Sequence, residues 1–336
     1  MAIGQSPVFT TRPARIHGWL KAISLVTVLA VFALVVLGGV VRVTGSGLGC
    51  PDWPLCYGKF LPPLEFTAVV EYSHRFVASV IVSPLILATC GIVWVWYRSQ
   101  RWLTIPAVLV LVLLVVQALL GGITVLQELP GEIVAVHLAV AEALLGCLIL
   151  LAVVAFRGPL ALGRRSANNG VSDQFPKLAM ASALAVYLLI ISGSLVTASG
   201  ATAACLSWPL CQGSLFPQGL PAAIHMGHRV VAAIVGLLVL YSVHLGFRGE
   251  GHSQAVWLLS VSVAAMFVMQ IVLGAVTVIA GFPIPLTALH LAMGTAVWGA
   301  ISATAFVSLT RQHSIDSYGE SSSETSSETS GQGAIA

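Results

Sequence analysis

The sequence predicts an all-α integral membrane protein whose eight transmembrane helices form two parallel four-helix bundles. Hydrophobic residues make up 57% of the 336-residue chain and charged residues only 8%, whereas a soluble domain carries roughly a quarter charged residues. Apolar runs of about 20 residues recur, each long enough to cross the hydrocarbon core. The chain also repeats itself once, which divides it into similar halves. The formal net charge of +3 comes from scattered basic residues, a pattern that does not indicate nucleic-acid binding.

The hydropathy pattern sets the predicted domain boundaries. Eight spans are expected, at residues 18–42, 70–97, 103–126, 132–156, 177–199, 222–247, 255–280 and 285–309. No small-residue cleavage site follows the first span, so we expect a retained helix rather than a signal peptide. The halves then cover 18–156 and 177–310. Around them we expect a cytoplasmic lead at 1–17, a cytoplasmic linker at 157–176 and a disordered cytoplasmic tail at 311–336, which is rich in Ser, Glu and Thr.

Basic residues predict the orientation, because short cytoplasmic loops carry an excess of Lys and Arg. Eleven of the fifteen fall on one side: Arg12, Arg15, Lys21, Arg98, Arg101, Arg157, Arg164, Arg165, Lys177, Arg248 and Arg311. The other four are Arg42, Lys59, Arg75 and Arg229. We therefore expect both termini in the cytoplasm, with membrane lipid around the helices.

The duplication is visible in four pairs of motifs. VTGSGLGCPDWPLC (43–56) returns as VTASGATAACLSWPLC (196–211), and SHRFVASVI (73–81) returns as GHRVVAAIV (227–235). QALLGGITV and HLAVAEALLG return as QIVLGAVTV and HLAMGTAVWG, always at an offset of 153 to 155 residues. Four spans per repeat bring the second half into the membrane from the same side. The halves should therefore be parallel, related by a pseudo-twofold axis along the membrane normal.

Each half carries two histidines near the outer ends of its spans, His74 with His137 and His228 with His290. All four lie roughly 5–8 Å below the predicted outer boundary at 1.5 Å per residue. Ionisable residues are costly inside a membrane, and the interior of a four-helix bundle is a natural cofactor site. Two imidazoles at one depth fit the axial positions of a haem iron.

These histidines also have alternative interpretations. A histidine near a helix end can simply hydrogen-bond a neighbour, and imidazole also binds zinc or copper. Neither half supplies a third or fourth ligand at a matching depth, which favours haem. Small residues at helix contacts would leave width for a planar ring: Gly121, Gly122, Gly146, Gly236, Gly274 and Gly294.

The two halves differ beside the histidines. Glu71 lies three residues before His74 on one helical face, whereas His225 occupies that position in the second half, and Leu195 stands near the position of Arg42. A carboxylate beside a haem edge could move protons or steady a cationic intermediate. Alternatively, Glu71 is an acid that favours the helix dipole. We expect the first half to carry out chemistry and the second to hold a permanent redox haem.

Arginines on the same side are candidates for binding haem propionates, because a guanidinium pairs well with carboxylates. Arg75 and Arg229 each follow a histidine, and Arg42 occurs only in the first half. The alternative for Arg75 and Arg229 is an interfacial anchor.

Four of the six cysteines lie in the predicted outer loops, as the pairs Cys50–Cys56 and Cys205–Cys211. Disulfides persist on the oxidising side of a membrane, and each pair is six residues apart across a Pro-containing turn. We expect both disulfides to form, either as structural or as redox-active bonds. The loops supply no further zinc ligands.

Together these residues resemble the haem A synthase family in its bacterial form. The resemblance covers roughly residues 15–310. It rests on EYSHR with Glu71 and His74, on HMGHR with His228, on His137 and His290, and on the two cysteine pairs with CPDWPLC.

The resemblance implies an oxidoreductase that converts haem O to haem A by successive two-electron oxidations of a ring methyl to a formyl group. His74 and His137 would bracket the substrate haem, and His228 and His290 would hold haem b. Glu71 would be the catalytic acid or charge stabiliser. The pair Cys50–Cys56 would serve haem handling or electron transfer, and Cys205–Cys211 would be mainly structural.

The implied partners are haem O synthase (the protohaem farnesyltransferase) upstream and an aa3-type oxidase subunit or assembly factor downstream. Assembly into a homo-oligomer remains open.

Two alternatives stay open at this point. One is a bis-histidine, cytochrome b-type electron carrier, although such relays usually hold haems at different depths. The other is a haem or small-molecule transporter. Against that, the sequence has no nucleotide-binding motif and no strongly broken pair of helices at the membrane midplane.

Overall fold

The structure is a computed structural model that describes residues 16–160, 174–248 and 253–310. Apart from a few flanking residues, the predicted lead, linker and tail lie outside the described residues. So do Arg12, Arg15, Arg164, Arg165 and Arg311, on which part of the predicted orientation rests. In the described ranges the regular elements are helices, with isolated β-bridges in addition.

Within the described residues, eight helical spans are long and apolar enough to cross a membrane, which confirms the predicted all-α membrane fold class. The second span is a composite of helix α2 (Phe66–Phe76), a π-helical segment (Val77–Val82) and helix α3 (Ser83–Tyr97). The remaining spans are single helices: α1 (Gly18–Val43), α4 (Arg101–Leu126), α5 (Gly131–Arg157), α6 (Gln174–Ala198), α7 (Leu220–Arg248), α8 (Gln254–Ile279) and α9 (Ile284–Ser308).

The π-helical segment ends at Val82, two residues before Pro84. Proline has no N–H to donate to the carbonyl four residues back, and its ring clashes with that carbonyl. A wider turn relieves this conflict, and π-bulges inside long helices have this origin or a functional one. The second span therefore continues through a proline without ending.

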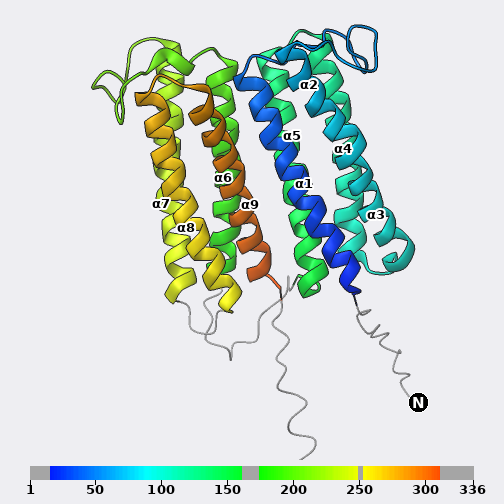
Figure 1. The fold of residues 1–336 in the computed structure, drawn as a ribbon. Coiled ribbons are helices and arrows are strands. Elements are labelled where there is room, and N and C mark those ends of the chain that lie inside the picture. Colours follow the sequence, from blue (N-terminus) through cyan, green and yellow to red (C-terminus); the bar gives the residue numbers. More distant parts are fainter. Residues whose placement is uncertain (1–15, 161–173, 249–252, 311–336) are drawn as a thin grey trace, which may run out of the picture.

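The helices form two bundles that stand side by side, with α1–α5 in one and α6–α9 in the other (Figure 1). Between the bundles, α5 packs against α6 and α9, and α1 packs against α9. Two loops, residues 44–65 and 199–219, lie at one end of the molecule and carry the cysteine pairs; we call this the Cys-loop end. Helix α1 begins and helix α9 finishes at the opposite end.

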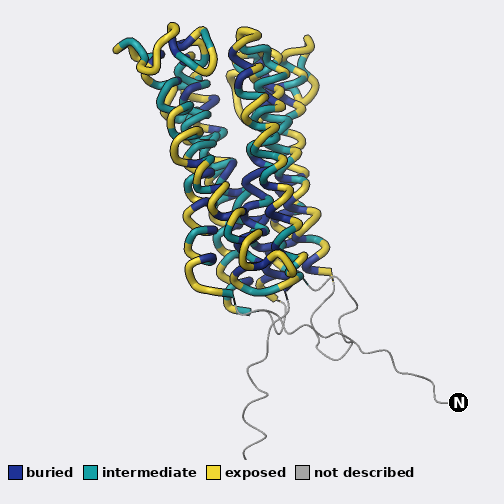
Figure 2. Tube along the Cα trace, turned by 90° about the vertical axis from the view of Figure 1, so that its right-hand side faces the viewer, coloured by how far each residue is buried: buried dark blue, intermediate teal, exposed yellow. Residues whose placement is uncertain are grey.

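The tightly packed apolar cores lie toward the end opposite the Cys loops. One core, in the first half, includes Leu20, Ile86 and Leu148. The other, in the second half, includes Val239 and Ile301. Figure 2 shows buried residues concentrated in the lower part of the bundles, with partly buried residues toward the Cys-loop end. Fewer residues are therefore fully buried at the end where the four histidines lie.

A buried acid lies between the two halves. Glu142 on α5 is 1% exposed, and Thr295 on α9 donates a hydrogen bond to its Oε1 over 2.6 Å. Trp298 donates from its indole to the backbone carbonyl of Glu142 over 2.9 Å. Glu142 and Thr295 are 153 residues apart, so they occupy equivalent positions in the two repeats. The sequence analysis did not single out this contact.

One detail of the predicted repeat alignment is wrong. Gly45 and Gly200 both adopt a left-handed backbone, with φ of +67° and +71°, in the turn that follows α1 or α6. This turn sets the offset at 155 residues, so the position equivalent to Arg42 is Thr197, not Leu195. The two VT strings match by chance and are displaced by two residues. At this repeat position the first half has an arginine and the second half has a small polar residue.

Candidate functional site

The four histidines lie inside the bundles, toward the Cys-loop end. His74 and His228 are eight residues beyond the starts of α2 and α7, and His137 and His290 are six residues beyond the starts of α5 and α9. At 1.5 Å per residue these positions are about 9–12 Å along their helices. These distances are longer than the predicted span starts imply, mainly because α2 begins at Phe66 and not near residue 70.

The two histidines of each half come from helices that are not packed against each other. In the described residues α1 packs against both α2 and α5, and α4 packs against α3 and α5, but α2 and α5 are not a packed pair. Likewise α6 packs against α7 and α9, and α8 packs against both, while α7 and α9 are not paired. The rings therefore approach one bundle interior from different sides.

A glycine on a neighbouring helix faces each imidazole. A Cβ at Gly38 or Gly193 would lie 3.1 Å from Cε1 of His74 or His228, respectively. A Cβ at Gly274 would lie 3.0 Å from Cε1 of His290, and one at Gly121 would lie 3.4 Å from Cε1 of His137. The sequence analysis included Gly121 and Gly274 among the helix contacts but missed Gly38 and Gly193. Four glycines in equivalent positions let the rings sit against helix backbone.

Each half also places a glutamine beside its second histidine. Nε2 of His137 lies 3.2 Å from Nε2 of Gln117, and Nε2 of His290 lies 3.4 Å from Nε2 of Gln270. Each glutamine amide carries both a donor and an acceptor group, so it can pair with the Nε2 atom of either histidine tautomer. The glutamines open the repeated QALLGGITV and QIVLGAVTV motifs, which could have revealed them. Nε2 of His137 and of His290 therefore points toward a hydrogen-bonding side chain on a neighbouring helix.

The Nδ1 atoms differ among the four histidines. Those of His74, His137 and His290 are buried without a hydrogen-bond partner in the described part of the chain. In contrast, Nδ1 of His228 lies 2.8 Å from Oγ of Ser192. All four residues keep some accessible surface, and for the three with buried Nδ1 atoms this surface belongs to other parts of the residue. In the described ranges no three His, Cys, Asp or Glu side chains converge on a metal position.

Both predicted disulfides are present in the structure. Cys50–Cys56 and Cys205–Cys211 have Cα–Cα distances of 4.7 Å and 5.1 Å. All four cysteines are completely buried in their loops. The loops thus form small closed units at the Cys-loop end of each bundle.

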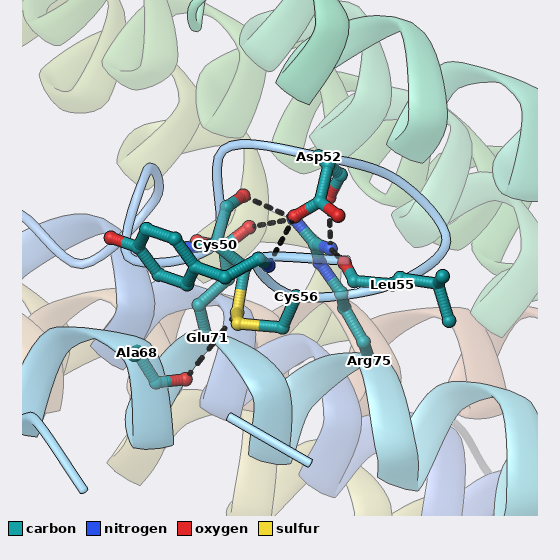
Figure 3. Close-up of polar contacts among 8 residues, drawn as sticks. Cys50, Asp52, Leu55, Cys56, Ala68, Glu71 and Arg75 are labelled. Carbon is teal, nitrogen blue, oxygen red and sulfur yellow. Dashed lines mark hydrogen bonds and ion pairs between the residues drawn. A yellow bond between two sulfur atoms is a disulfide. The ribbon is translucent and has the colours of Figure 1, made fainter. Parts of the chain in front are cut away.

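Glu71 connects the first disulfide loop to α2 (Figure 3). The residue is 3% exposed; its Oε2 accepts a hydrogen bond from the Cys50 backbone N–H over 2.8 Å, and its Oε1 pairs with Arg75. The carboxylate is therefore held on one side by the loop and on the other by a cation. Three residues further along the same helix is His74.

Arg75 is engaged with the same loop. Its guanidinium donates to the carbonyl oxygens of Asp52, Leu55 and Cys50 over 2.6–2.8 Å, in addition to its ion pair with Glu71. These contacts use both terminal nitrogens, with two partners each. The predicted propionate role would compete with this network.

The second half keeps the same construction with different chemistry. Arg229 donates to the carbonyl oxygens of Ser207, Pro209 and Cys205. His225 replaces Glu71: its Nδ1 lies 3.2 Å from the Ala201 carbonyl, and its Nε2 lies 3.3 Å from Arg229. A neutral imidazole can hold the loop by donating to a carbonyl, where Glu71 accepts from an N–H. The loop attachment is thus retained, while the negative charge exists only in the first half.

Arg42 lies in the last turn of α1 and is partly buried. Among the hydrogen bonds of the described residues there is none from its guanidinium. Unlike Arg75 and Arg229, it is therefore not committed to a loop.

Asp52 closes the first loop by accepting hydrogen bonds from the backbone N–H groups of Gly58 and Tyr57 over 2.7 Å and 2.6 Å. The bond from Gly58, and then that from Tyr57, hold the pKa of Asp52 below its ordinary value. A depressed pKa in the folded state means that this stabilisation is fully present above the ordinary Asp pKa of about 3.9. It is lost as the pH falls through the lower, folded value.

Replacing Asp52 by alanine is therefore expected to speed reduction of the Cys50–Cys56 bond by a water-soluble phosphine severalfold at neutral pH, because the loop opens more often. In the wild type, protection should hold from pH 7 to about 4 and weaken below that. The internal control is Cys205–Cys211, whose loop is closed by Ser207 accepting from the Gln212 N–H over 2.8 Å. Equal acceleration at both disulfides would contradict this role.

The fold and the site together define a class: a multi-pass helical membrane protein whose two similar halves each enclose a pair of imidazoles beneath a disulfide-closed loop. Residues 21–69 and 64–302 match the COX15-CtaA family, described as "Cytochrome oxidase assembly protein". The chain belongs to this family.

Several curated bacterial proteins are similar over most of their length. A protein named "Heme A synthase" from Alkalihalophilus pseudofirmus is 34% identical over 234 residues, which cover 67% of this chain and 75% of that protein. Proteins with the same name from Bacillus mycoides and Bacillus licheniformis are 29% and 28% identical, over 81% and 71% of this chain and 88% and 79% of theirs.

Proposed function

We propose that this chain is a haem A synthase, which oxidises a ring methyl of haem O to a formyl group through an alcohol. The observation that carries the proposal is the repeated pair of imidazoles, each set against a glycine, with a buried carboxylate beside only one pair. Family membership and the names of the relatives support it. Each of the two steps removes two electrons, so the site must handle protons as well as electrons.

The residues present fit a haem in each half. Neutral imidazole binds iron through one nitrogen and carries a proton on the other. Nδ1 of His74, His137 and His290 is buried, so Nε2 is the nitrogen that we assign to the iron. The extensive apolar cores lie toward the opposite end of the bundles and do not include these histidines.

In this proposal His74 and His137 orient the substrate haem, and His228 and His290 hold haem b. When bound, haem b supplies one-electron redox chemistry. Glu71 acts in the first half, where its carboxylate can accept a proton or stabilise positive charge near the substrate. The ion pair with Arg75 and the bond from Cys50 keep that carboxylate at a fixed position.

Arg42 is the arginine best suited to a propionate, because its guanidinium is not engaged with a loop. Arg75 and Arg229 would meet a propionate only by sharing donors that now hold the loops. We propose that their first role is to fix the loops that cover the two bundles, and that propionate binding is secondary for them.

We further propose that the Cys-loop end faces the outside of the cell and that both termini are cytoplasmic, as the distribution of Lys and Arg indicates. Haem O synthase would supply the substrate. An aa3-type oxidase subunit or assembly factor would accept the product. The Cys50–Cys56 loop, tied to Glu71, would serve haem handling in the first half, and Cys205–Cys211 would be mainly structural.

The test is co-expression of the chain with a haem O synthase, followed by chromatography of the extracted haems. Wild type should yield haem A and its alcohol intermediate. His74→Ala should yield haem O without haem A, while the protein still accumulates in the membrane. Wild-type membranes that contain haem O but neither oxidised product would overturn the proposal.

The glycines that face the histidines should be as necessary as the ligands. Gly193→Leu is expected to lower haem b content per chain at least about tenfold, the lower range for losing support around a metal ligand, because any side chain there meets His228. Gly91→Leu on α3 is the matched control, since a Cβ there meets no atom within 4 Å. Absorbance of the reduced haem relative to protein measures both. Equal haem content in the two variants would show that close ring-to-helix contact is unnecessary.

A further inference from the structure

Among the four proposed ligands, only His228 has a hydrogen-bond partner for its Nδ1 atom in the described part of the chain. We infer that Ser192 is a positioning residue that fixes His228 through Nδ1 and thereby lowers the reduction potential of a haem held by His228 and His290. The inference rests on the proposed function and goes beyond it, by giving a reason why the haem of the second half should differ in potential.

The hydrogen bonding at Ser192 determines which atom donates. The hydroxyl lies 2.7 Å from the Leu189 carbonyl oxygen, which can only accept, so its single proton points there. Its oxygen then accepts from Nδ1 of His228 over 2.8 Å. This arrangement selects the tautomer with the proton on Nδ1 and leaves the lone pair on Nε2, the nitrogen that would bind iron.

The first half lacks this device. Gly193 and Gly38 face His228 and His74 in the same way, so the residue that corresponds to Ser192 is Leu37. A leucine cannot accept a hydrogen bond, and Nδ1 of His74 is buried without a partner in the described part of the chain. His137 and His290 also have unpartnered Nδ1 atoms, which leaves the Ser192 bond as a difference between the two pairs.

A hydrogen bond accepted from Nδ1–H increases the basicity of a ligating imidazole. A more basic ligand donates more electron density and stabilises ferric iron more than ferrous iron. Ser192 therefore lowers the potential in the second half, and the absence of an acceptor at Leu37 leaves the first half without that effect.

The experiment is potentiometric titration of the purified full chain in a His74→Ala background, where the haem signal comes from the second half. Ser192→Ala should weaken the preference for ferric iron roughly tenfold, which raises the midpoint by about 59 mV for one electron. Ser192→Thr, which keeps a hydroxyl, should restore most of the shift. Ser194→Ala is the matched control. Ser194 lies two residues beyond Ser192, and its hydroxyl donates to the Ile191 carbonyl and not to a histidine.

The reciprocal variant tests the same idea in the other half. Leu37→Ser in a His228→Ala background should lower the midpoint of the first-half haem, and it decides the matter if Ser192→Ala does not accumulate. An unchanged midpoint in Ser192→Ala with full haem content would overturn the inference and leave the proposed function standing. Equal haem content per chain in wild type and His228→Ala would overturn both the inference and the proposed function.

Discussion

Glu71→Gln is expected to lower the rate of haem A formation by about 10²-fold or more, the range for loss of a positioned acid–base group. Glutamine has nearly the same shape and can still accept from the Cys50 N–H, so the loop should stay attached to α2. It has no charge, however, and can neither take up a proton from the substrate nor stabilise a cation. Haem content per chain should remain close to that of the wild type.

The measurement is the ratio of haem A plus its alcohol intermediate to haem O in extracts from cells that co-express a haem O synthase. Glu132→Gln is a suitable control, because Glu132 is an exposed acid in the first turn of α5, at the same end of the molecule. Unchanged product formation in Glu71→Gln would mean that the carboxylate serves only to hold the loop. Faster reduction of Cys50–Cys56 in this variant would indicate loop opening and would assign part of the loss to structure.

His228→Ala should have an equally large but different effect. Removing this ligand is expected to reduce haem b content by more than the roughly 10–100-fold that follows loss of an outer partner alone, and to stop product formation. The first-half site is intact, so haem O should still bind. His74→Ala should do the reverse and retain haem b while losing conversion.

His244→Ala serves as the control, since His244 lies on the same helix α7 near the opposite end and is exposed. The readout is the amount of each extracted haem per mole of purified protein. Loss of haem O instead of haem b in His228→Ala would reverse the assignment of the two halves.

The sequence was sufficient for those features that depend on composition and repetition. Eight apolar runs predicted eight spans to within about four residues, because a bilayer requires a minimum hydrophobic length. The duplication identified the four histidines as two equivalent pairs. The spacing of the cysteines predicted the two disulfides. Helix ends were less certain, and α2 begins at Phe66, four residues before the predicted start of the second span.

Features that depend on contacts between helices could not be predicted in this way. Gly38 and Gly193 look like ordinary small residues until the histidines opposite them are located. Ser192 and Leu37 become informative only once the turn at Gly45 and Gly200 has fixed the repeat register. Glu142 could have been noticed as a lone intramembrane acid, but its contact with Thr295 across the two halves required the structure.

The claim that one half converts its haem and the other keeps it is tested most directly by the haem composition of the purified wild-type protein, expressed together with a haem O synthase. The account predicts one haem b per chain together with haem O or its oxidised products. Two haem b per chain, with no haem O or oxidised product, would contradict it and would favour a bis-histidine electron carrier.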